Sequence, residues 1–232
     1  MRAFRLTLLL FFLLLQAFGA DSALALDPGK LITQYDIRNY TAKDGLPMNT
    51  VKKVFQDSRG YIWVGTQEGL ARFDGVRFRI YDKSTSPGLR SSFIRDIAED
   101  HTGHLWVATN GGGISRLEGD DFVSYGAAEG LNHDVVNTLL VARDGSLVVG
   151  TEKGISRFAD GRLTTWIFTD NVKANNIQAL IQDSTGVLYV GRYGALLTRI
   201  AWADFTAASG TPQSGVTYCR VPLPARRTEI SP

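Results

Sequence analysis

The stretch DSRGYIWVGTQEGLARFDG, residues 57–75, decides the fold, because the chain repeats it as DHTGHLWVATNGGGISRLEGD from residue 100. Each copy joins a turn, an apolar run with aromatic residues, a second turn and a run that mixes basic and apolar side chains. A repeat of 20–50 residues defines a fold before any single motif does. The array as a whole is therefore expected to carry the function.

The pattern occurs four times in one register. The glycine of the first turn recurs at residues 60, 103, 145 and 186. The position three residues after that glycine holds Trp63, Trp106, Val148 and Tyr189. A Gly-Leu pair starts the loop upstream at residues 45, 88 and 130, and Asn-Val replaces it at residue 171. Agreement of independent positions in one register indicates a true repeat.

Each unit is predicted to contain four short strands, which in the first unit cover 51–57, 61–66, 70–74 and 76–81. These runs are rich in β-branched and aromatic residues and are bounded by Gly, Asp, Asn and Ser. Four-stranded units of this length are typical of β-propeller blades. We predict an all-β propeller over 26–200, with about four blades near 44–86, 87–128, 129–169 and 170–200.

The sequence at the two ends of the array allows either a closed ring or an incomplete propeller. The segment QYDIRNYTAKDGLP resembles the fourth strand and exit loop of later units, which predicts an outer strand over 34–41 that could complete the last blade. Four blades is the small end of the propeller range, so an incomplete propeller is the alternative. Residues 201–232 abandon the repeat and are predicted to be an irregular tail.

The tryptophan position is expected to serve stability rather than chemistry. A middle strand covered on both sides reads as a continuous apolar run, and a Trp there would fill the wedge between blades. The small residues two positions after the aromatic position would allow close approach; they are Gly65, Ala108, Gly150 and Gly191. The recurring arginines Arg72, Arg116 and Arg157 are expected to extend over the blade face.

Charge and cysteine content exclude several classes of function. Lys and Arg total 25 against 23 for Asp and Glu, and no long basic run is present. The sequence therefore gives no basis for a nucleic-acid partner. The single cysteine, Cys219, rules out an internal disulfide and a cysteine-based metal site.

The first 25 residues are predicted to be a secretory signal peptide. Two arginines precede an apolar run from Leu6 to Phe18, and Ala23-Leu24-Ala25 supplies a small-x-small cleavage site. The run is shorter than the ~20 residues of a membrane-spanning helix. We expect a chain secreted across the inner membrane into the periplasm, and an uncleaved membrane anchor is the alternative.

Loops at one end of the blades are the candidate binding surface. In a four-stranded meander the tight Asp- and Gly-containing turns share one end, and the variable polar loops share the other. A rigid scaffold with variable loops at one end is typical of a binding site. The predicted binding residues are Asn49, Gln67, Glu68, Arg90, Asn110, His133, Asp134, Glu152, Lys153, Arg192 and Tyr193.

Motifs for catalysis, cofactors and metals are weak, so we predict none of the three. His133 and Asp134 could form an acid/base pair, but no partnered nucleophile is present. TNGGGIS lacks the Gly-Lys-Ser/Thr of a phosphate-binding loop. The Asp-x-x-Gly turns lack the alternating oxygen ligands of a calcium loop. His101 and His104 flank a tight turn, where surface positions are expected.

Residues 45–78 and 92–117 resemble the two-component regulator propeller repeat. The resemblance covers roughly residues 35–200 and weakens where Ala142 and Val148 replace the leading Asp and the aromatic residue, and where Arg192 replaces Thr. It implies an extracytoplasmic sensor region of a hybrid histidine kinase or diguanylate cyclase. Members typically continue into a β-sandwich, a transmembrane helix and an output domain, and none of these is recognisable in this sequence.

The sequence thus predicts the sensory, ligand- or partner-binding propeller of a two-component-type receptor, as an N-terminal fragment without its output domain. The resemblance implies an extracytoplasmic ligand such as a carbohydrate, and self-association of the receptor, as partners. Two alternatives stay open. One is a propeller enzyme, a lyase or hydrolase, and the other is an inactive truncated remnant.

Overall fold

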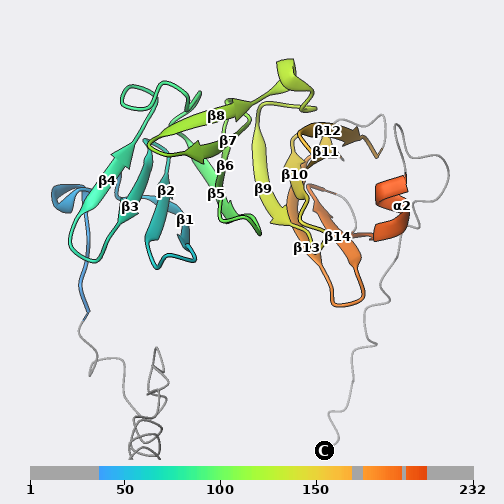
Figure 1. The fold of residues 1–232 in the computed structure, drawn as a ribbon, viewed down its shortest axis with the longest axis horizontal. Coiled ribbons are helices and arrows are strands. Elements are labelled where there is room, and N and C mark those ends of the chain that lie inside the picture. Colours follow the sequence, from blue (N-terminus) through green and yellow to red (C-terminus); the bar gives the residue numbers. More distant parts are fainter. Residues whose placement is uncertain (1–36, 169–174, 195–196, 208–232) are drawn as a thin grey trace, which may run out of the picture. The chain divides into compact units, whose positions relative to one another are not determined.

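The described part of the chain is an all-β array of short antiparallel sheets (Figure 1). The computed structural model describes residues 37–168, 175–194 and 197–207. All strands among the described residues lie within one compact unit, which begins at Tyr40. The predicted β-propeller class is confirmed, with one antiparallel sheet for each repeat unit.

The strand bounds follow the repeat. The first sheet contains β1 (Val51–Gln56), β2 (Ile62–Thr66), β3 (Leu70–Phe73) and β4 (Phe78–Tyr81). The second contains β5 (Ile94–Glu99), β6 (Leu105–Thr109), β7 (Ile114–Glu118) and β8 (Asp121–Tyr125). The third contains β9 (Val136–Val141), β10 (Leu147–Thr151), β11 (Gly154–Ala159) and β12 (Arg162–Trp166). The fourth contains β13 (Ile177–Gln182), β14 (Val187–Arg192) and β15 (Thr198–Ala201).

Each sheet is a simple meander, so the four strands predicted for the first unit are confirmed. The tight turn between β1 and β2 forms because Asp57 closes it with its own side chain. Its Oδ1 accepts the backbone N–H groups of Arg59 and Tyr61 at 3.0 and 2.9 Å. Gly60 occupies the turn at φ +89°, a conformation that favours glycine.

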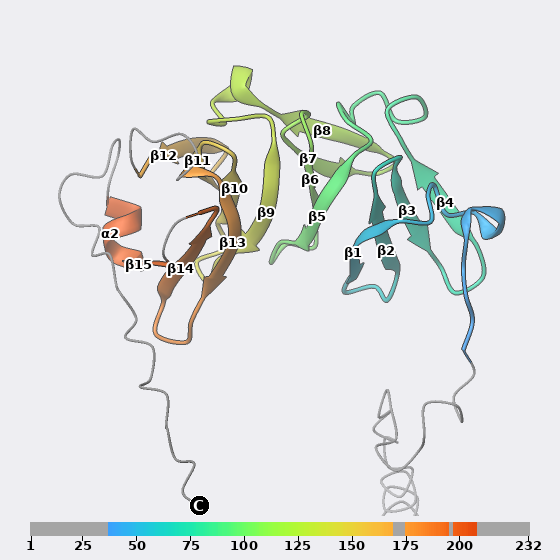
Figure 2. The same cartoon turned by 180° about the vertical axis from the view of Figure 1, so that it is seen from behind.

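The sheets pack face to face through their first strands. β1 contacts β5, β5 contacts β9, and β9 contacts β13, and Figures 1 and 2 show the sheets in this order from two sides. Trp63 is fully buried between the first and second sheets, and Trp106 is 2% exposed between the second and third. The wedge role predicted for these tryptophans is confirmed.

Close approach of the sheets explains two of the small residues. A Cβ added at Gly65 would lie 2.8 Å from Cγ2 of Ile94, and one added at Gly150 would lie 2.8 Å from Cγ2 of Ile177. Both contacts are with the first strand of the following sheet. A larger residue at either position would push neighbouring sheets apart.

The leading aspartate of the repeat also fixes the tryptophan, which the sequence reasoning did not predict. Nε1 of Trp63 donates to Oδ2 of Asp57 at 2.9 Å, and Nε1 of Trp106 donates to Oδ2 of Asp100 at 2.8 Å. A buried indole N–H needs a hydrogen-bond partner. One carboxylate therefore closes the turn and satisfies the core tryptophan.

The outer strand predicted over 34–41 is absent from its described part, because residues 37–41 form no strand. Thr41 caps a 3-10 helix at Ala42–Asp44, and its backbone N–H and hydroxyl both donate to Asp44. This local cap takes the chain out of the extended conformation. Tyr40 packs on Phe73 and Phe78 of the first sheet, with ring centroids at 5.1 and 5.4 Å, rather than on the last.

The tail prediction is wrong at its start. Residues Trp202–Ala207 form a helix, α2, directly after β15, and Phe205 is only 2% exposed. Phe205 packs on Trp166 with ring centroids 4.2 Å apart, in the core between the third and fourth sheets. The helix contains two aromatic residues, Trp202 and Phe205, among Ala and Thr. The prediction from the repeat did not use this signal. Residues 208–232, with Cys219, lie outside the described residues.

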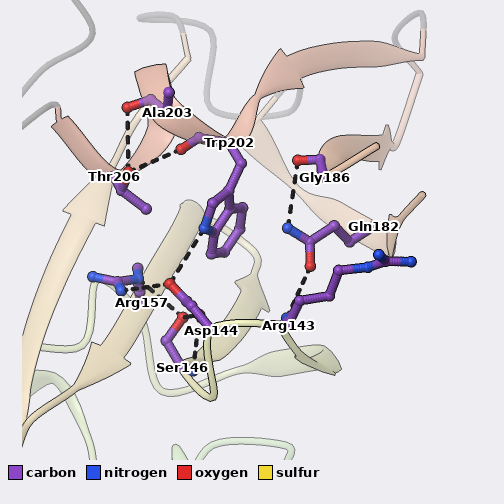
Figure 3. Close-up of polar contacts among 9 residues, drawn as sticks. All are labelled: Arg143, Asp144, Ser146, Arg157, Gln182, Gly186, Trp202, Ala203 and Thr206. Carbon is purple, nitrogen blue, oxygen red and sulfur yellow. Dashed lines mark hydrogen bonds and ion pairs between the residues drawn. The ribbon is translucent and has the colours of Figure 1, made fainter. Parts of the chain in front are cut away.

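Trp202 of α2 compensates for the weak third repeat (Figure 3). That repeat has Ala142 and Val148 where the first two have the paired aspartate and tryptophan. Nε1 of Trp202 donates to Oδ2 of Asp144 at 3.2 Å, and the guanidinium carbon of Arg157 lies 6.0 Å from its ring centroid. An Asp–Trp–Arg cluster is therefore present in the third sheet, with its tryptophan supplied from later in the chain.

The arginines predicted to extend over the blade faces do so. The guanidinium carbon of Arg72 lies 5.8 Å from the ring centroid of Trp63, and that of Arg116 lies 5.5 Å from that of Trp106. The signal peptide predicted at 1–25 lies outside the described residues. No helix in the described part of the chain is long and apolar enough to cross a membrane.

Candidate functional site

The meander order gives the array two unlike ends. Links between first and second strands, and between third and fourth strands, lie at what we call the turn end. Links between second and third strands, and links from one sheet to the next, lie at the loop end. The loop end includes residues 67–69, 82–93, 110–113, 126–135 and 152–153.

A row of polar side chains crosses the first strands of successive sheets near the loop end. It occupies one position of the repeat, and its members are Lys52, Arg95, Asn137 and Gln178. We call these four residues the inner polar row. All four first strands therefore keep a polar residue at the same position.

Hydrogen bonds join the inner polar row across three sheets. The guanidinium of Arg95 donates to the side-chain oxygens of Asn137 and, at 3.2 Å, of Asn110. Nδ2 of Asn137 donates to Oδ1 of Asn176 at 2.9 Å and to the carbonyl of Ile177 at 2.8 Å. Groups from the second, third and fourth sheets thus form one continuous network.

The row is completed by Gln178, whose Nε2 donates to Oδ1 of Asn176 at 2.5 Å. Gln178 is exposed, whereas Arg95, Asn137 and Asn176 are half-buried. Lys52 is exposed as well. Half-buried polar groups held by one another are fixed in place, and the exposed ones present amide and ammonium groups to solvent.

A second polar contact at the adjacent repeat position ties the sheets together. Nζ of Lys53 lies 2.7 Å from Oδ1 of Asp96. Oδ2 of Asp96 accepts the backbone N–H of Leu139 at 2.9 Å, and Asp96 is only 8% exposed. The first three sheets are therefore fixed relative to one another directly beside the inner polar row.

Arg90 and Glu129 connect two of the sheet-to-sheet loops. The guanidinium donates to both carboxylate oxygens at 2.9 and 2.8 Å, in the two-bond geometry that suits this pair. The backbone N–H of Gly126 also donates to Glu129, at 2.6 Å. Arg90 first, and then this N–H, lower the pKa of Glu129 to about 2, and Glu129 raises the pKa of Arg90.

Three of the predicted binding residues join these networks. Asn110 accepts from Arg95, and Arg90 pairs with Glu129. Oδ1 of Asp134 accepts the backbone N–H of Ala127 at 2.7 Å. These three residues lie in the loops that flank the inner polar row.

The other predicted residues lie in exposed or half-buried loop positions, except for Arg192, which is buried at the end of β14. Oδ1 of Asn49 accepts the backbone N–H of Ala42 at 2.7 Å. Tyr193 is 62% exposed, and its backbone N–H donates to the carbonyl of Asn176 at 2.8 Å. Arg192 is 9% exposed, with its guanidinium 5.1 Å from the centroid of the Phe168 ring. Exposed or half-buried positions are occupied by Gln67, Glu68, Glu152 and Lys153.

His133 and Asp134 are engaged by backbone groups rather than by each other. Nδ1 of His133 accepts the N–H of Val135 at 3.1 Å, and the carboxylate of Asp134 accepts from Ala127. No hydrogen bond joins the two side chains in the described structure. This geometry does not support the acid/base pair that the sequence left open. His101 and His104 are exposed, as predicted.

The sequence reasoning missed the inner polar row, because it searched loops and treated every strand as core. The signal was available in the repeat alignment. Arg95, Asn137 and Gln178 stand at one position of three first strands, and each directly follows a fully buried Ile or Val. Comparing positions along the array would have found them without a structure.

Two grooves are present at the turn end, although its links are tight turns. A groove of about 450 Å³ lies between the first and second sheets, with Arg59, His104 and Glu118 in its lining. A groove of about 170 Å³ lies between the second and third sheets, with Thr102 and Asp160 in its lining. Trp202 fills the equivalent place between the third and fourth sheets. Within the described residues no group of three or more possible metal ligands is found.

Comparisons of sequence confirm the resemblance. Residues 45–68 and 88–111 each match the model of the family described as two component regulator propeller. A 49-residue segment is 41% identical to Histidine kinase P4 of Formosa agariphila. This match covers 21% of the chain and 4% of the kinase, so the chain spans a small part of that relative.

Comparisons of structure show the propeller fold. The extracellular domain of a hybrid two component system from B. thetaiotaomicron superposes with a TM-score of 0.59 at 23% identity, covering 67% of this chain and 22% of that one. Virginiamycin B lyase from Staphylococcus aureus superposes with a TM-score of 0.55 at 19% identity, covering 68% of this chain and 55% of that one. An extracellular domain of a two component system and a lyase thus share this fold.

Proposed function

We propose that this chain is an extracytoplasmic sensory propeller that binds a ligand at the loop end of its blades, as part of a two-component-type receptor. The observation that carries the proposal is the inner polar row, in which Arg95, Asn137 and Gln178 are fixed across three sheets. The matches to two component regulator propeller repeats support the receptor context.

The chemistry of the row favours a ligand rich in hydroxyl groups, such as a carbohydrate. Amide groups both donate and accept, and Lys52 adds an exposed cation beside them. A few fixed polar groups on a rigid scaffold are the usual means of orienting a small ligand. We also propose that an output domain transmits the signal, because the segment that matches Histidine kinase P4 covers only 4% of that kinase.

A propeller lyase is the second candidate, because the S. aureus lyase has the same fold. Its support within this chain is limited to the polar loop end. His133, which lies in a loop at that end, already accepts a backbone hydrogen bond through Nδ1. Binding without turnover is therefore the function that the geometry favours.

The proposal is tested with the purified full chain and a panel of soluble oligosaccharides, with thermal unfolding as the readout. At least one oligosaccharide is expected to raise the unfolding temperature. Gln178→Ala and Asn110→Ala should abolish that shift. Gln178 belongs to the inner polar row, and Asn110 accepts a hydrogen bond from Arg95 of that row. Arg77→Ala, at the turn end with a side chain 86% exposed, is the matched control and should keep it.

Two outcomes would decide against loop-end carbohydrate binding. One is the absence of a shift with any member of the panel, and the other is a shift that Gln178→Ala and Asn110→Ala leave intact. Chromatography of the same mixtures separates the candidates. Conversion of an oligosaccharide that is lost in His133→Ala would favour the lyase.

The proposed periplasmic location has its own test. Expression of the full chain in a Gram-negative host should place it in the periplasmic fraction, with a mass that corresponds to loss of residues 1–25. A chain that keeps these residues and stays with the membrane fraction would favour the uncleaved anchor instead.

A further inference from the structure

The three interfaces between neighbouring sheets use equivalent apolar positions, and the outermost sheets each present one half of that set. We call the face that a sheet turns toward the preceding sheet its leading face, and the opposite one its trailing face. The leading face of the first sheet contains Val54, Ile62 and Val64, of which Ile62 and Val64 pack in a small cluster with Leu46. The trailing face of the fourth sheet contains Ile181, Tyr189 and Arg199.

The leading face of the first sheet lacks cover at a position that is buried elsewhere. The residues equivalent to Val54 are Ile97 and Leu139, which are 2% and 8% exposed, and Leu180, which packs in the core of the third interface. Val54 itself is 58% exposed. The residue type suits an interface, and no sheet of the described residues lies against it.

The trailing face of the fourth sheet shows the complementary deficit. The residues equivalent to Ile181 are Phe55, Ala98 and Leu140, and all three pack in the interface cores. Ile181 is 63% exposed. An apolar residue is again kept where no described residue covers it.

At the turn end a hydrogen bond recurs at the first and third of the three interfaces, whereas Val141 occupies the acceptor position in the second. The backbone N–H of Ser58 donates to Oε2 of Glu99 at 2.7 Å, and that of Arg143 donates to Oε1 of Gln182 at 3.0 Å (Figure 3). In each case a turn residue of one sheet bonds to the residue that ends the first strand of the next sheet. The fourth sheet offers Ser184 as the equivalent donor.

Gln56 is the equivalent acceptor on the first sheet. Nε2 of Gln56 donates to the carbonyl of Gly60 at 3.4 Å, as Nε2 of Gln182 donates to that of Gly186 at 3.4 Å. In Gln182 this bond leaves Oε1 to accept from Arg143. Among the described residues, no donor reaches Oε1 of Gln56 and the N–H of Ser184 has no acceptor.

We propose that a second copy of this chain docks head to tail, with the trailing face of its fourth sheet on the leading face of the first sheet. Val54 and Ile181 would be buried against the partner, and the N–H of Ser184 would donate to Gln56 across the contact. The two faces differ, so the interface is heterologous and forms a ring or continues as a chain. Two copies contribute eight sheets, within the propeller range.

This association is independent of what the loop end binds. Sedimentation velocity of the purified full chain over a wide concentration range is the first measurement. The chain is expected to self-associate, and Val54→Asp and Ile181→Asp should each raise the dissociation constant more than about tenfold, because each buries an unpaired carboxylate. Val76→Asp is the matched control, since Val76 is 89% exposed in the turn between β3 and β4.

A mixture of the two variants separates head-to-tail contact from other kinds. Val54→Asp keeps an intact trailing face and Ile181→Asp keeps an intact leading face, so together they should form a dimer that neither forms alone. A wild-type chain that is monomeric at every concentration overturns the proposal. Oligomers that survive both variants, or that only one variant dissociates, overturn it as well.

Milder substitutions keep the test valid if a charged variant fails to fold. Gln56→Glu should preserve self-association, because Glu99 accepts the equivalent bond in the first interface. Gln56→Leu should weaken it. Equal association of the two variants would contradict the proposed contact, and circular dichroism at low concentration checks that both are folded.

Discussion

A single aspartate in each of the first two repeats performs two tasks that the sequence presents as separate signals. Asp57 closes its turn through Oδ1 and holds the indole of Trp63 through Oδ2. Asp100 does the same for Trp106. Burial opposes ionisation of Asp57, but the hydrogen bonds from Trp63, Tyr61 and Arg59 outweigh it and lower its pKa. The turn and the core are therefore linked through one side chain.

Substitutions in the first repeat should separate packing from the hydrogen bond. Trp63→Ala is expected to cost about 3–5 kcal/mol of unfolding free energy, because it leaves a cavity between sheets. Asp57→Ala should cost about 1–3 kcal/mol, because it leaves the buried indole N–H unpaired. Urea unfolding of the two variants gives both values, and Val76→Ala on the surface is the control. A smaller loss for Trp63→Ala than for Asp57→Ala would contradict this account.

The ion pair of Arg90 and Glu129 predicts a carboxyl pKa that can be measured directly. The pKa of Glu129 is about 2, below its ordinary value of 4.5. Arg90→Gln should raise it toward 4.5, because Arg90 is the largest cause of the shift. Carbon-13 NMR of the Glu129 carboxyl group measures the change.

Asp183 supplies an internal control for that titration. Its pKa is also about 2, but Thr185 and the N–H of Val187 are the causes, and it lies at the turn end. Its titration should be unchanged in Arg90→Gln. Movement of both pKa values together would point to a general loss of structure instead.

At the scale of elements, α2 replaces what the third repeat lacks. Trp202 donates to Asp144 beside Arg157, and Phe205 packs on Trp166. Phe122 of β8 similarly packs on Tyr81 of the preceding sheet, with ring centroids at 5.8 Å. The helix therefore supplies aromatic contacts where the described fourth sheet has three strands.

The role of α2 predicts a graded response at Trp202. Trp202→Phe should keep most of the packing and lose only the bond to Asp144, at a cost of about 1 kcal/mol. Trp202→Ala should cost more, about 2–4 kcal/mol, because the ring is also lost. Chemical unfolding measures both, and Ala203→Ser is a matched helix control. Equal losses of unfolding free energy in Trp202→Phe and Trp202→Ala would mean that the ring does not contribute to packing.

At the scale of the whole molecule, the turn aspartates predict loss of stability in acid. Asp57, Asp100, Asp144 and Asp183 all have pKa values below their ordinary value of 3.8. A carboxyl group with a lowered pKa stabilises the fold above the ordinary value and loses that effect as pH falls through the folded one. The ion pair of Glu129 follows the same sign between 4.5 and about 2.

Thermal unfolding measured at a series of pH values tests the combined effect of these carboxyl groups. The unfolding temperature is expected to be nearly constant above about pH 5 and to fall steeply below about pH 4. Asp144→Asn should reduce the slope of that fall without changing its sign. An unfolding temperature that rises on acidification would contradict the pKa directions.

Local periodicity was enough to predict the propeller, its strands and the tryptophan wedge, because each depends on short-range pattern and turn chemistry. The inner polar row was also present in the sequence at residues 52, 95, 137 and 178, but its meaning appears only when neighbouring sheets bring these side chains within hydrogen-bond distance.

Only the tertiary structure decided how the array ends. Trp202 contacts Asp144 across 58 positions of the chain, and Tyr40 packs on the first sheet instead of completing the last. Neither contact follows a repeat, so no period predicts it. The sequence by itself determined which residues repeat, and packing between distant segments determined which of them meet and which faces stay uncovered.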